Sequence, residues 1–339
     1  MTLTEPQNRS IPINDTTVYV LKRLAQASIV IFMVSILGFL ALKLSPGDCF
    51  SELRSDPKTP RAIIKALEER LGYNQPLLIQ YLNWFGHALS GDFGVRCQGF
   101  SPVTPLILGR AGATLMLAIA SLITTWAIAI PLGIFCAVRQ NTWIDRFVQV
   151  ISYMLQGFPS FVIAILLLML AQNTSLFPVG GLTSIDYLDL SPIGKVFDVA
   201  YHLVLPVITL TIIGFAGLQR IMRGNLLDVL QQDYIRTARA KGLPENRIIY
   251  IHALRNAVNP IITLLGFEFA GLLSGSFITE TFFGLPGLGK LILEAVNQKD
   301  VNLVMASLML GTVMLVIGNL LADLLLKAVD PRIRLEEMD

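Results

Sequence analysis

Residues 233–258 read DYIRTARAKGLPENRIIYIHALRNAV and form a basic segment between two long apolar runs. Residues 220–255 carry seven Lys or Arg residues against three acidic residues. Short loops on the cytoplasmic side of a membrane protein accumulate such positive charge. The segment is therefore predicted to lie in the cytosol between two membrane spans.

Two short helices are predicted within this segment. Asp233 is a good N-cap residue and Gly242 a good C-cap residue, so the first helix is predicted between them. Pro244 suits the first turn of a second helix, because Glu245 would then lie at its positive end. Two short capped helices in a basic loop make a docking surface.

The composition predicts an all-α integral membrane protein. Hydrophobic residues make up 53% of the chain and charged residues 15%, whereas soluble domains carry about 25% charged residues. Crossing the hydrocarbon core takes roughly 20 helical residues, and six apolar blocks are long enough. About six transmembrane helices are therefore predicted, at residues 24–42, 111–138, 147–171, 201–218, 258–279 and 303–326.

The flanking charges predict the orientation of these spans. Basic residues flank the predicted spans on one side, so both termini are predicted to be cytoplasmic; they are Lys22, Arg23, Arg139, Arg146, Lys327, Arg332 and Arg334. Residues 172–200 contain a single basic residue, Lys195, so this loop fits the outer face. Residues 45–110 form a loop long enough to be translocated whatever its charge. Residues 1–18 are predicted to be a cytoplasmic extension without a cleavable signal peptide, and 19–339 the transmembrane domain.

The outer loop, residues 45–110, is predicted to be partly helical. Apolar residues at helical spacing predict amphipathic helices at 59–71 and 76–89, which we expect to pack on the outer rim of the protein. Cys49 and Cys97 both lie in this loop, where a bacterial periplasm permits a disulfide. We hypothesise that they pair; the alternative is two free thiols, because the sequence does not show that they are close.

The sequence contains no complete catalytic motif. Residues 284–291, GLPGLGKL, match a phosphate-binding loop except that Leu291 replaces the metal-binding Ser or Thr. The segment also follows a membrane helix on the predicted outer face, so we expect a turn before a short helix and no ATP hydrolysis. An intramembrane hydrolase is the alternative class, and it depends only on hydroxyl groups such as that of Ser274.

Two acidic residues fall inside predicted spans, where a charge in lipid is costly and must face protein or water. Glu268 has two interpretations: it lies on a translocation pathway, as Ser274 would, or it is hydrogen-bonded to a neighbouring helix. Asp323 lies near the cytoplasmic end of the last span, so a nearby Arg is the expected partner.

The basic segment also resembles a known family. DYIRTARAKGL followed by HALRNAVNP is similar to the cytoplasmic coupling loop of permease subunits of ATP-binding-cassette importers, in the dipeptide/oligopeptide/nickel branch. The general pattern there is E-A-A-x3-G-x9-I-x-L-P, which Ala238, Gly242 and Leu254 match. The departures from it resemble the branch's own T-A-R-A-K-G…H-A-L-R-N version, and they are Arg236, Thr237, His252 and Arg255.

Further signatures of that branch follow in order from about Tyr19 onward. They are PGD at 46–48, LGYNQPLLIQYLNWFGHALSGDFG at 71–94, FPSF at 158–161, FPVGG at 177–181, HLVLP at 202–206, Glu280 with FGLPGLG at 283–289, and DPRIR at 330–334. The resemblance therefore covers nearly the whole chain except residues 1–18.

The resemblance implies a type I importer permease in the bacterial inner membrane, without catalysis of its own. Its partners would be a homologous second permease, two ATPase subunits that use ATP and Mg, an outer substrate-binding protein and membrane lipid, with no nucleic acid. The chain itself would hold no cofactor. The cargo implied is a di- or oligopeptide, with nickel chelates and glutathione as alternatives.

The coupling loop implied by the resemblance spans residues 219–257. Its first helix would be a rigid plug seated on one ATPase subunit. The residues carried over to that role are Asp233, Tyr234, Arg236, Thr237, Ala238, Arg239, Ala240, Lys241, Gly242 and Leu254.

Overall fold

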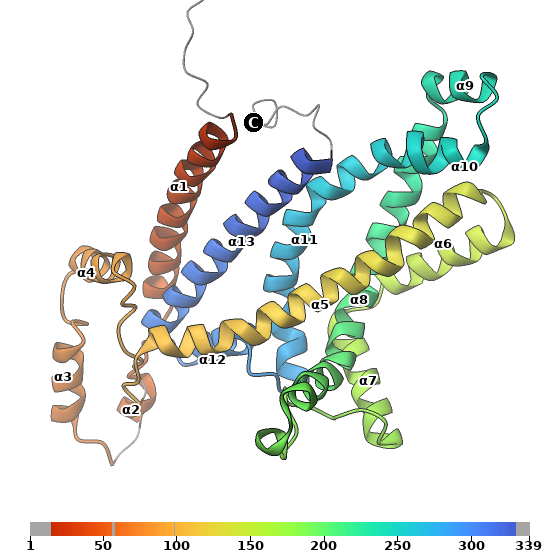
Figure 1. Cartoon of the computed structure of the whole chain (residues 1–339). Helices are drawn as coiled ribbons and strands as arrows, with labels where there is room; N and C mark the ends of the chain where they lie inside the picture. The colour runs from red at the N-terminus through yellow and green to blue at the C-terminus, as the bar shows by residue number, and fades with distance from the viewer. Residues whose placement is uncertain (1–14, 56–57, 98, 330–339) are drawn as a thin grey trace, which may run out of the picture.

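The structure is a computed structural model that describes residues 15–55, 58–97 and 99–329. Helices are its regular elements (Figure 1). The longer ones are α1 (Asp15–Leu44), α5 (Val103–Val138), α6 (Trp143–Gln156), α7 (Ser160–Thr174), α8 (Pro192–Leu230), α11 (Leu254–Phe282) and α13 (Val301–Val329). The shorter ones are α2 (Ser51–Ser55), α3 (Arg61–Arg70), α4 (Leu77–Leu89), η1 (Tyr187–Asp189), α9 (Asp233–Ala240), α10 (Glu245–Arg247), η2 (Ile248–Ala253) and α12 (Leu288–Asn297).

The prediction of about six membrane spans is confirmed, with one correction. Five stretches are long and apolar enough to cross a membrane, and they are Tyr19–Leu44, Val103–Val138, Pro192–Leu230, Glu245–Phe269 and Val301–Leu321. The predicted third span, 147–171, is not one helix: α6 and α7 meet at a bend of 100°. Pro159 precedes α7 and disfavours helical geometry at Phe158, so the chain breaks after Gly157.

Helices α5 and α8 are longer than the predicted spans, because they continue beyond the apolar blocks. Helix α8 begins at Pro192, where the Ser191 hydroxyl accepts a hydrogen bond from the Gly194 amide at 3.1 Å. Proline suits the first turn because it lacks an amide hydrogen that would be unpaired there. The last part of the loop predicted at 172–200, and the beginning of the loop predicted at 219–257, are therefore helical.

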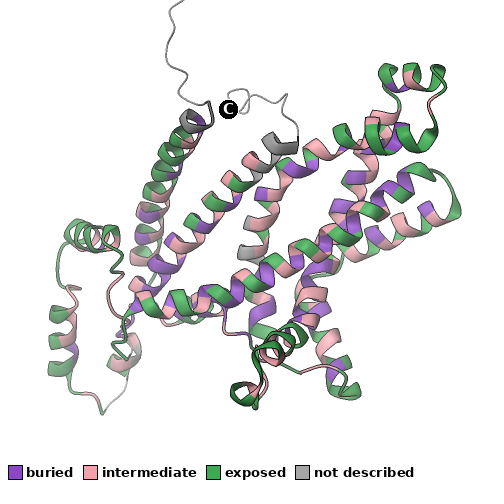
Figure 2. Ribbon diagram, viewed as in Figure 1, coloured by how far each residue is buried: buried purple, intermediate pink, exposed green. Residues whose placement is uncertain are grey.

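The long helices pack as a bundle in which α5 and α8, α11 and α13, and α1 and α13 are neighbours. Buried residues gather where these helices meet, whereas α1 leaves many apolar side chains exposed (Figure 2). The start of α1, the end of α13 and helix α9 lie at the upper side of Figure 1, and α3 and α12 lie at the lower side. The start of α1, the end of α13 and α9 therefore share one side of the bundle. That this side is cytoplasmic stays a prediction.

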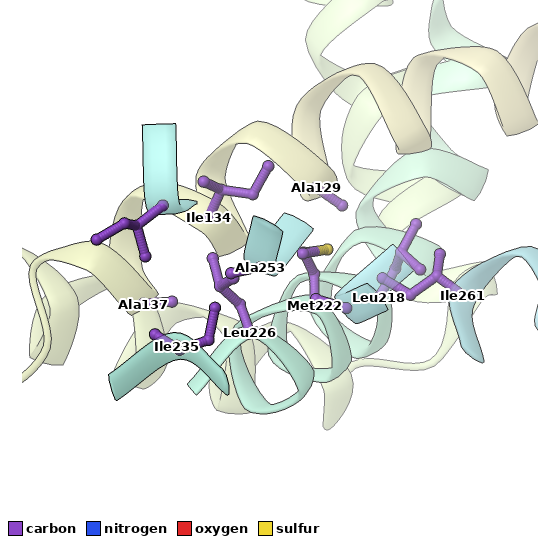
Figure 3. Close-up of a cluster of buried hydrophobic side chains, with 11 residues drawn as sticks. Ala129, Ile134, Ala137, Leu218, Met222, Leu226, Ile235, Ala253 and Ile261 are labelled. Atoms are coloured by element: carbon purple, nitrogen blue, oxygen red, sulfur yellow. The ribbon is translucent and has the colours of Figure 1, made fainter. Parts of the chain in front are cut away.

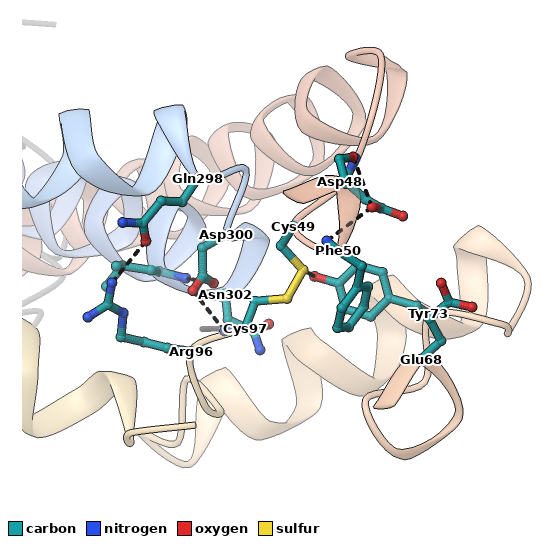
Figure 4. The surroundings of a disulfide bond; sticks show 12 residues. Asp48, Cys49, Phe50, Glu68, Tyr73, Arg96, Cys97, Gln298, Asp300 and Asn302 are labelled. Carbon is teal, nitrogen blue, oxygen red and sulfur yellow. Dashed lines mark hydrogen bonds between the residues drawn. A yellow bond between two sulfur atoms is a disulfide. The ribbon is translucent and has the colours of Figure 1, made fainter. Parts of the chain in front are cut away.

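The α2–α4 module (residues 45–102) joins α1 to α5. The two amphipathic helices predicted in it are confirmed as α3 and α4. The structure joins Cys49 to Cys97 in a disulfide with a Cα–Cα distance of 6.1 Å (Figure 4). The Cys97 amide donates a hydrogen bond to Asp300 Oδ2 at 2.8 Å, which fastens the module to the turn between α12 and α13.

A buried carboxylate holds α12 in place. Glu280, near the end of α11, is fully buried, and its Oε1 accepts a hydrogen bond from the Thr114 hydroxyl of α5 at 2.7 Å. Its Oε2 accepts one from the Lys290 amide, in the first turn of α12, at 3.0 Å. Amides of a first helical turn lack partners within the helix, so an acceptor from α11 satisfies one of them. The turn and short helix predicted from GLPGLGKL are confirmed.

Gly287 lies directly against this carboxylate, and a Cβ atom there would overlap it. Gly287→Ala is therefore expected to lower the free energy of unfolding by about 1–3 kcal/mol, because the Glu280 carboxylate would have to move away from its donors Thr114 and Lys290. The thermal unfolding midpoint of the purified complex measures this. Gly224→Ala is the matched control, because its Cβ would meet no atom within 4 Å. Equal midpoints for the two variants would contradict the prediction.

Candidate functional site

The first helix of the basic segment, α9, spans Asp233–Ala240. Its N-cap is Gln232, so the prediction of Asp233 as N-cap is wrong by one residue. Asp233 instead opens the first turn, where the helix dipole favours a carboxylate.

The predicted end of α9 at Gly242 is observed. Gly242 has φ 75°, its amide donates to the Arg239 carbonyl at 2.9 Å, and the Leu243 amide donates to the Ala238 carbonyl at 3.4 Å. This is the Schellman arrangement, which uses a left-handed residue to end a helix. The turn is therefore fixed by local backbone hydrogen bonds.

The second predicted helix is not a separate unit. Pro244 is the N-cap of α10 and lies just before its first turn. Helix α10 then runs through the π-helical turn η2 directly into α11. The basic segment is thus one short separate helix, α9, followed by the beginning of the next span. Because α10 is continuous with α11, a displacement of α10 would move α11 with it.

An apolar anchor holds α9 against the ends of the spans. Ile235 is fully buried, and it belongs to a cluster that includes Leu226 of α8, Ile134 of α5 and Ile248 of η2 (Figure 3). The signal for this anchor was present in the sequence, since Ile235 is the one large aliphatic residue of α9. A single aliphatic residue on so short a helix sets no periodic apolar pattern, so the sequence alone does not predict that it is buried.

The remaining residues of α9 and its turn face outward. Ala238 is half-buried, and the exposed ones are Asp233, Tyr234, Arg236, Thr237, Arg239, Ala240, Lys241 and Gly242. Leu254 does not belong to this surface: it is half-buried on α11 and packs against the Ile235 cluster. The structure therefore brings together a polar, mainly cationic surface on a buried aliphatic anchor.

Two contacts brace this surface. Arg239 Nη2 lies 2.7 Å from Glu245 Oε1, and the Glu245 carboxylate raises the pKa of Arg239. The amide of Asn256 on α11 donates a hydrogen bond to the Tyr234 hydroxyl at 2.7 Å. The charge of Arg239 is thus partly used within the chain. Lys241 makes no ion pair with any residue that the structure describes, and it is exposed.

The two candidate pathway residues lie on α11. Glu268 lines a cavity of about 520 Å³ between α8 and α11, together with apolar residues such as Leu210, Ile213 and Phe267. The buried Trp126 Nε1 of α5 makes no hydrogen bond to a described residue. Ser274 lies on the same helix, but its side chain is outside the described residues.

The intramembrane Asp323 has the partner expected of it. Arg23 Nη2 lies 3.2 Å from Asp323 Oδ2, and the Tyr19 hydroxyl donates to the same oxygen at 2.7 Å. This contact joins α1 to α13. Within residues 15–55, 58–97 and 99–329, no group of three His, Cys, Asp or Glu side chains could hold a metal ion.

Known proteins resemble this chain over most of its length. AppB, the oligopeptide transport system permease protein of Bacillus subtilis (strain 168), is 39% identical over 317 residues, which cover 93% of this chain and 98% of AppB. The probable peptide ABC transporter permease protein y4tP of Sinorhizobium fredii is 36% identical over 94% of this chain and 99% of its own length. The glutathione transport system permease protein GsiC of Salmonella typhimurium is 34% identical over 93% of this chain and 98% of its own length.

The fold and the family also agree. A solved structure of inward-facing conformations of the MetNI methionine ABC transporter matches with a TM-score of 0.51 at 16% identity, covering 66% of this chain and 96% of that chain. This likeness concerns the fold alone. The family model described as binding-protein-dependent transport system inner membrane component matches residues 129–335. The chain therefore belongs to this family of importer permeases, whose members are transport subunits and not enzymes.

Proposed function

We propose that this chain forms half of the translocation pathway of a peptide importer and couples that pathway to ATP hydrolysis by partner subunits. The observation that supports a peptide as the cargo is the similarity to AppB and y4tP over nearly the full length of all three chains. The same likeness favours a permease over an intramembrane hydrolase. Glutathione is the second candidate cargo because GsiC is nearly as similar.

The coupling role is supported by the surface of α9. A short helix with exposed cations and a buried aliphatic anchor suits docking to an acidic cleft on an ATPase subunit. ATP-driven closure of two ATPase subunits, with Mg bound beside the nucleotide, would displace α9. The connected spans would then move between inward- and outward-facing states. In this proposal the basic segment and both termini are cytoplasmic, and the α2–α4 module lies on the outer face, where the substrate-binding protein would dock.

Transport by the complete complex tests the cargo. The chain would be purified with its second permease and ATPase subunits, and the complex reconstituted in liposomes containing ATP and Mg. Uptake of a labelled tripeptide and of labelled glutathione would be measured with the cognate binding protein outside. We expect ATP-dependent accumulation of the tripeptide and none of glutathione. Accumulation of glutathione alone would contradict peptide as the cargo.

Glu268 is our candidate for a pathway residue, together with Ser274. The carboxyl group is the charged group among the residues that line its cavity, so it would attract the ammonium group of a peptide. In the same liposomes, Glu268→Gln would keep the shape of the side chain and remove that attraction. If this variant takes up the tripeptide as fast as the unaltered complex does, Glu268 does not contribute to the pathway and its role is structural.

A further inference from the structure

Helix α4 exposes an apolar stripe that water would not favour. Leu78, Leu82 and Leu89 are 68%, 56% and 76% exposed at helical spacing. Beside this stripe, the Tyr81 hydroxyl lies 2.8 Å from Ser35 Oγ of α1, and the Phe85 and Phe32 rings are 5.7 Å apart. These contacts fix the helix beside the end of α1 (Figure 1), and the three leucines of the stripe stay exposed. A helix of this kind lies in the membrane interface.

An apolar groove separates α4 from α1. Its cavity of about 280 Å³ is lined by Ile36, Phe39, Leu40, Leu77, Leu78 and Tyr81. Leu40 and Leu78 are also exposed, so the groove opens on the apolar surface of the protein. Such a groove has the chemistry of an acyl-chain site, because every lining side chain offers carbon surface to it.

Two further cavities, each lined by both polar and apolar residues, share a lining residue with this groove. One of about 420 Å³ shares Leu77 with the groove, and one of about 400 Å³ shares Phe39 with it. Lys43, in the last turn of α1, lines both of these cavities. The apolar groove and Lys43 are thus neighbours through Phe39, which lines the groove and whose ring centre lies 5.7 Å from Lys43 Nζ.

Lys43 has no anionic partner among the described residues. Its Nζ lies 4.0 Å from the centre of the Tyr73 ring and 5.7 Å from that of Phe39. Asp48 is the nearby acid, but its carboxylate is held by Arg54, with Nη2 at 2.9 Å from Oδ2. Aromatic rings hold an ammonium group in place while leaving its N–H donors free.

A second hydrogen-bond donor belongs to a residue that lines the same cavity as Lys43. The Trp84 side chain is buried, its Nε1 has no hydrogen-bond acceptor, and it lines the cavity of about 400 Å³ with Lys43. Buried donors in native proteins nearly always have an acceptor. Glu69 and Asp92 line the same cavity, but neither accepts a hydrogen bond from Trp84 Nε1. An anionic ligand beside Lys43 would supply the missing acceptor.

We propose that the groove between α1 and α4 binds a phospholipid, with its acyl chain against Phe39 and Tyr81 and its phosphate at the Lys43 ammonium group. The apolar groove distinguishes this ligand from free phosphate or a peptide carboxylate, neither of which would fill it. A lipid held there would fix α4, and through it the α2–α4 module, on the end of α1.

Native mass spectrometry of the complete purified transporter tests the site. The delipidated complex would be titrated with dioleoyl phosphatidylglycerol, with dioleoylglycerol, which lacks the phosphate, and with inorganic phosphate. We expect tight retention of phosphatidylglycerol and weak retention of dioleoylglycerol. Lys43→Met should weaken phosphatidylglycerol binding about tenfold, the effect of losing one charge-assisted contact. Lys43→Arg keeps the charge and should restore binding.

The matched control is Lys65→Met, which removes an exposed lysine of α3 outside the groove and should leave binding unchanged. Equal phosphatidylglycerol binding by the Lys43→Met variant and the unaltered protein would overturn the proposal. Equal retention of dioleoylglycerol and phosphatidylglycerol would overturn the role of the phosphate. Retention of inorganic phosphate without retention of lipid would show an anion site and no lipid site.

Discussion

Replacing Gly242 with aspartate is expected to lower peptide uptake about a hundredfold or more, the size of effect seen when a central contact of an interface is lost. The exposed turn at Gly242 ends the cationic surface of α9, so a complementary partner surface would be acidic. An added carboxylate would be repelled there and would also hold the two surfaces apart. ATP hydrolysis by the partner subunits should then no longer depend on the substrate-binding protein.

The substitution should leave the chain itself folded. Gly242 has φ 75°, and a Cβ atom there would meet no atom within 4 Å. A left-handed residue costs about 1–2 kcal/mol when it is not glycine, and Asp is one of the residues that adopts this conformation most readily. Loss of uptake can therefore be separated from loss of protein by measuring the amount of each variant in the membrane.

Two control variants make this prediction specific. Gly242→Asn has nearly the same size and backbone preference without the charge, so it should retain more uptake than Gly242→Asp. Gly91→Asp places the same residue at φ 81°, also with no atom within 4 Å, in the α2–α4 module. It should retain uptake. Normal uptake by Gly242→Asp would argue strongly against docking at this turn.

The sequence predicted the features of the fold that depend on neighbouring residues. The turn at Gly242 is an example, because a left-handed glycine and the carbonyls that it caps lie within one helical turn. The number of spans was also predictable, since an apolar block must be about as long as the bilayer is thick. The break before α7 also had a local signal, Pro159. Hydropathy alone did not reveal it, because the short 157–159 linker does not interrupt the apolar block.

Features that join distant parts of the chain were not predictable in the same way. Helix α8 continues past its apolar block to Leu230, and Arg223 in this part pairs with the buried Asp145 of α6 at 2.7 Å. Nothing local indicates that residues so far apart in the sequence meet. The anchor of α9 is of the same kind: the sequence shows an isolated Ile235, and only the fold shows α5, α8 and η2 around it.

Ile235→Ala is expected to separate binding of the ATPase subunits from the transmission of force. The side chain is fully buried between α9 and the ends of α5 and α8, and truncation of such a residue costs about 2–5 kcal/mol. Helix α9 should then detach from the spans at times, so its backbone amides should exchange hydrogen faster and trypsin should cleave more readily at Arg236. Peptide uptake should fall in proportion.

The exposed side chains of α9 are unchanged in this variant, so the ATPase subunits should still be recovered with the complex. That outcome distinguishes Ile235→Ala from Gly242→Asp, which alters the docking surface and leaves the anchor intact. Ile185→Ala is the control, because Ile185 is fully exposed between α7 and α8 and its truncation should change neither exchange nor uptake.

Ile235→Val should give an intermediate result, since loss of one methyl group costs about 0.5–1.5 kcal/mol. If uptake persists while α9 exchanges freely, motion does not reach the spans through this anchor, and the continuous path from α10 through η2 into α11 would have to carry it alone.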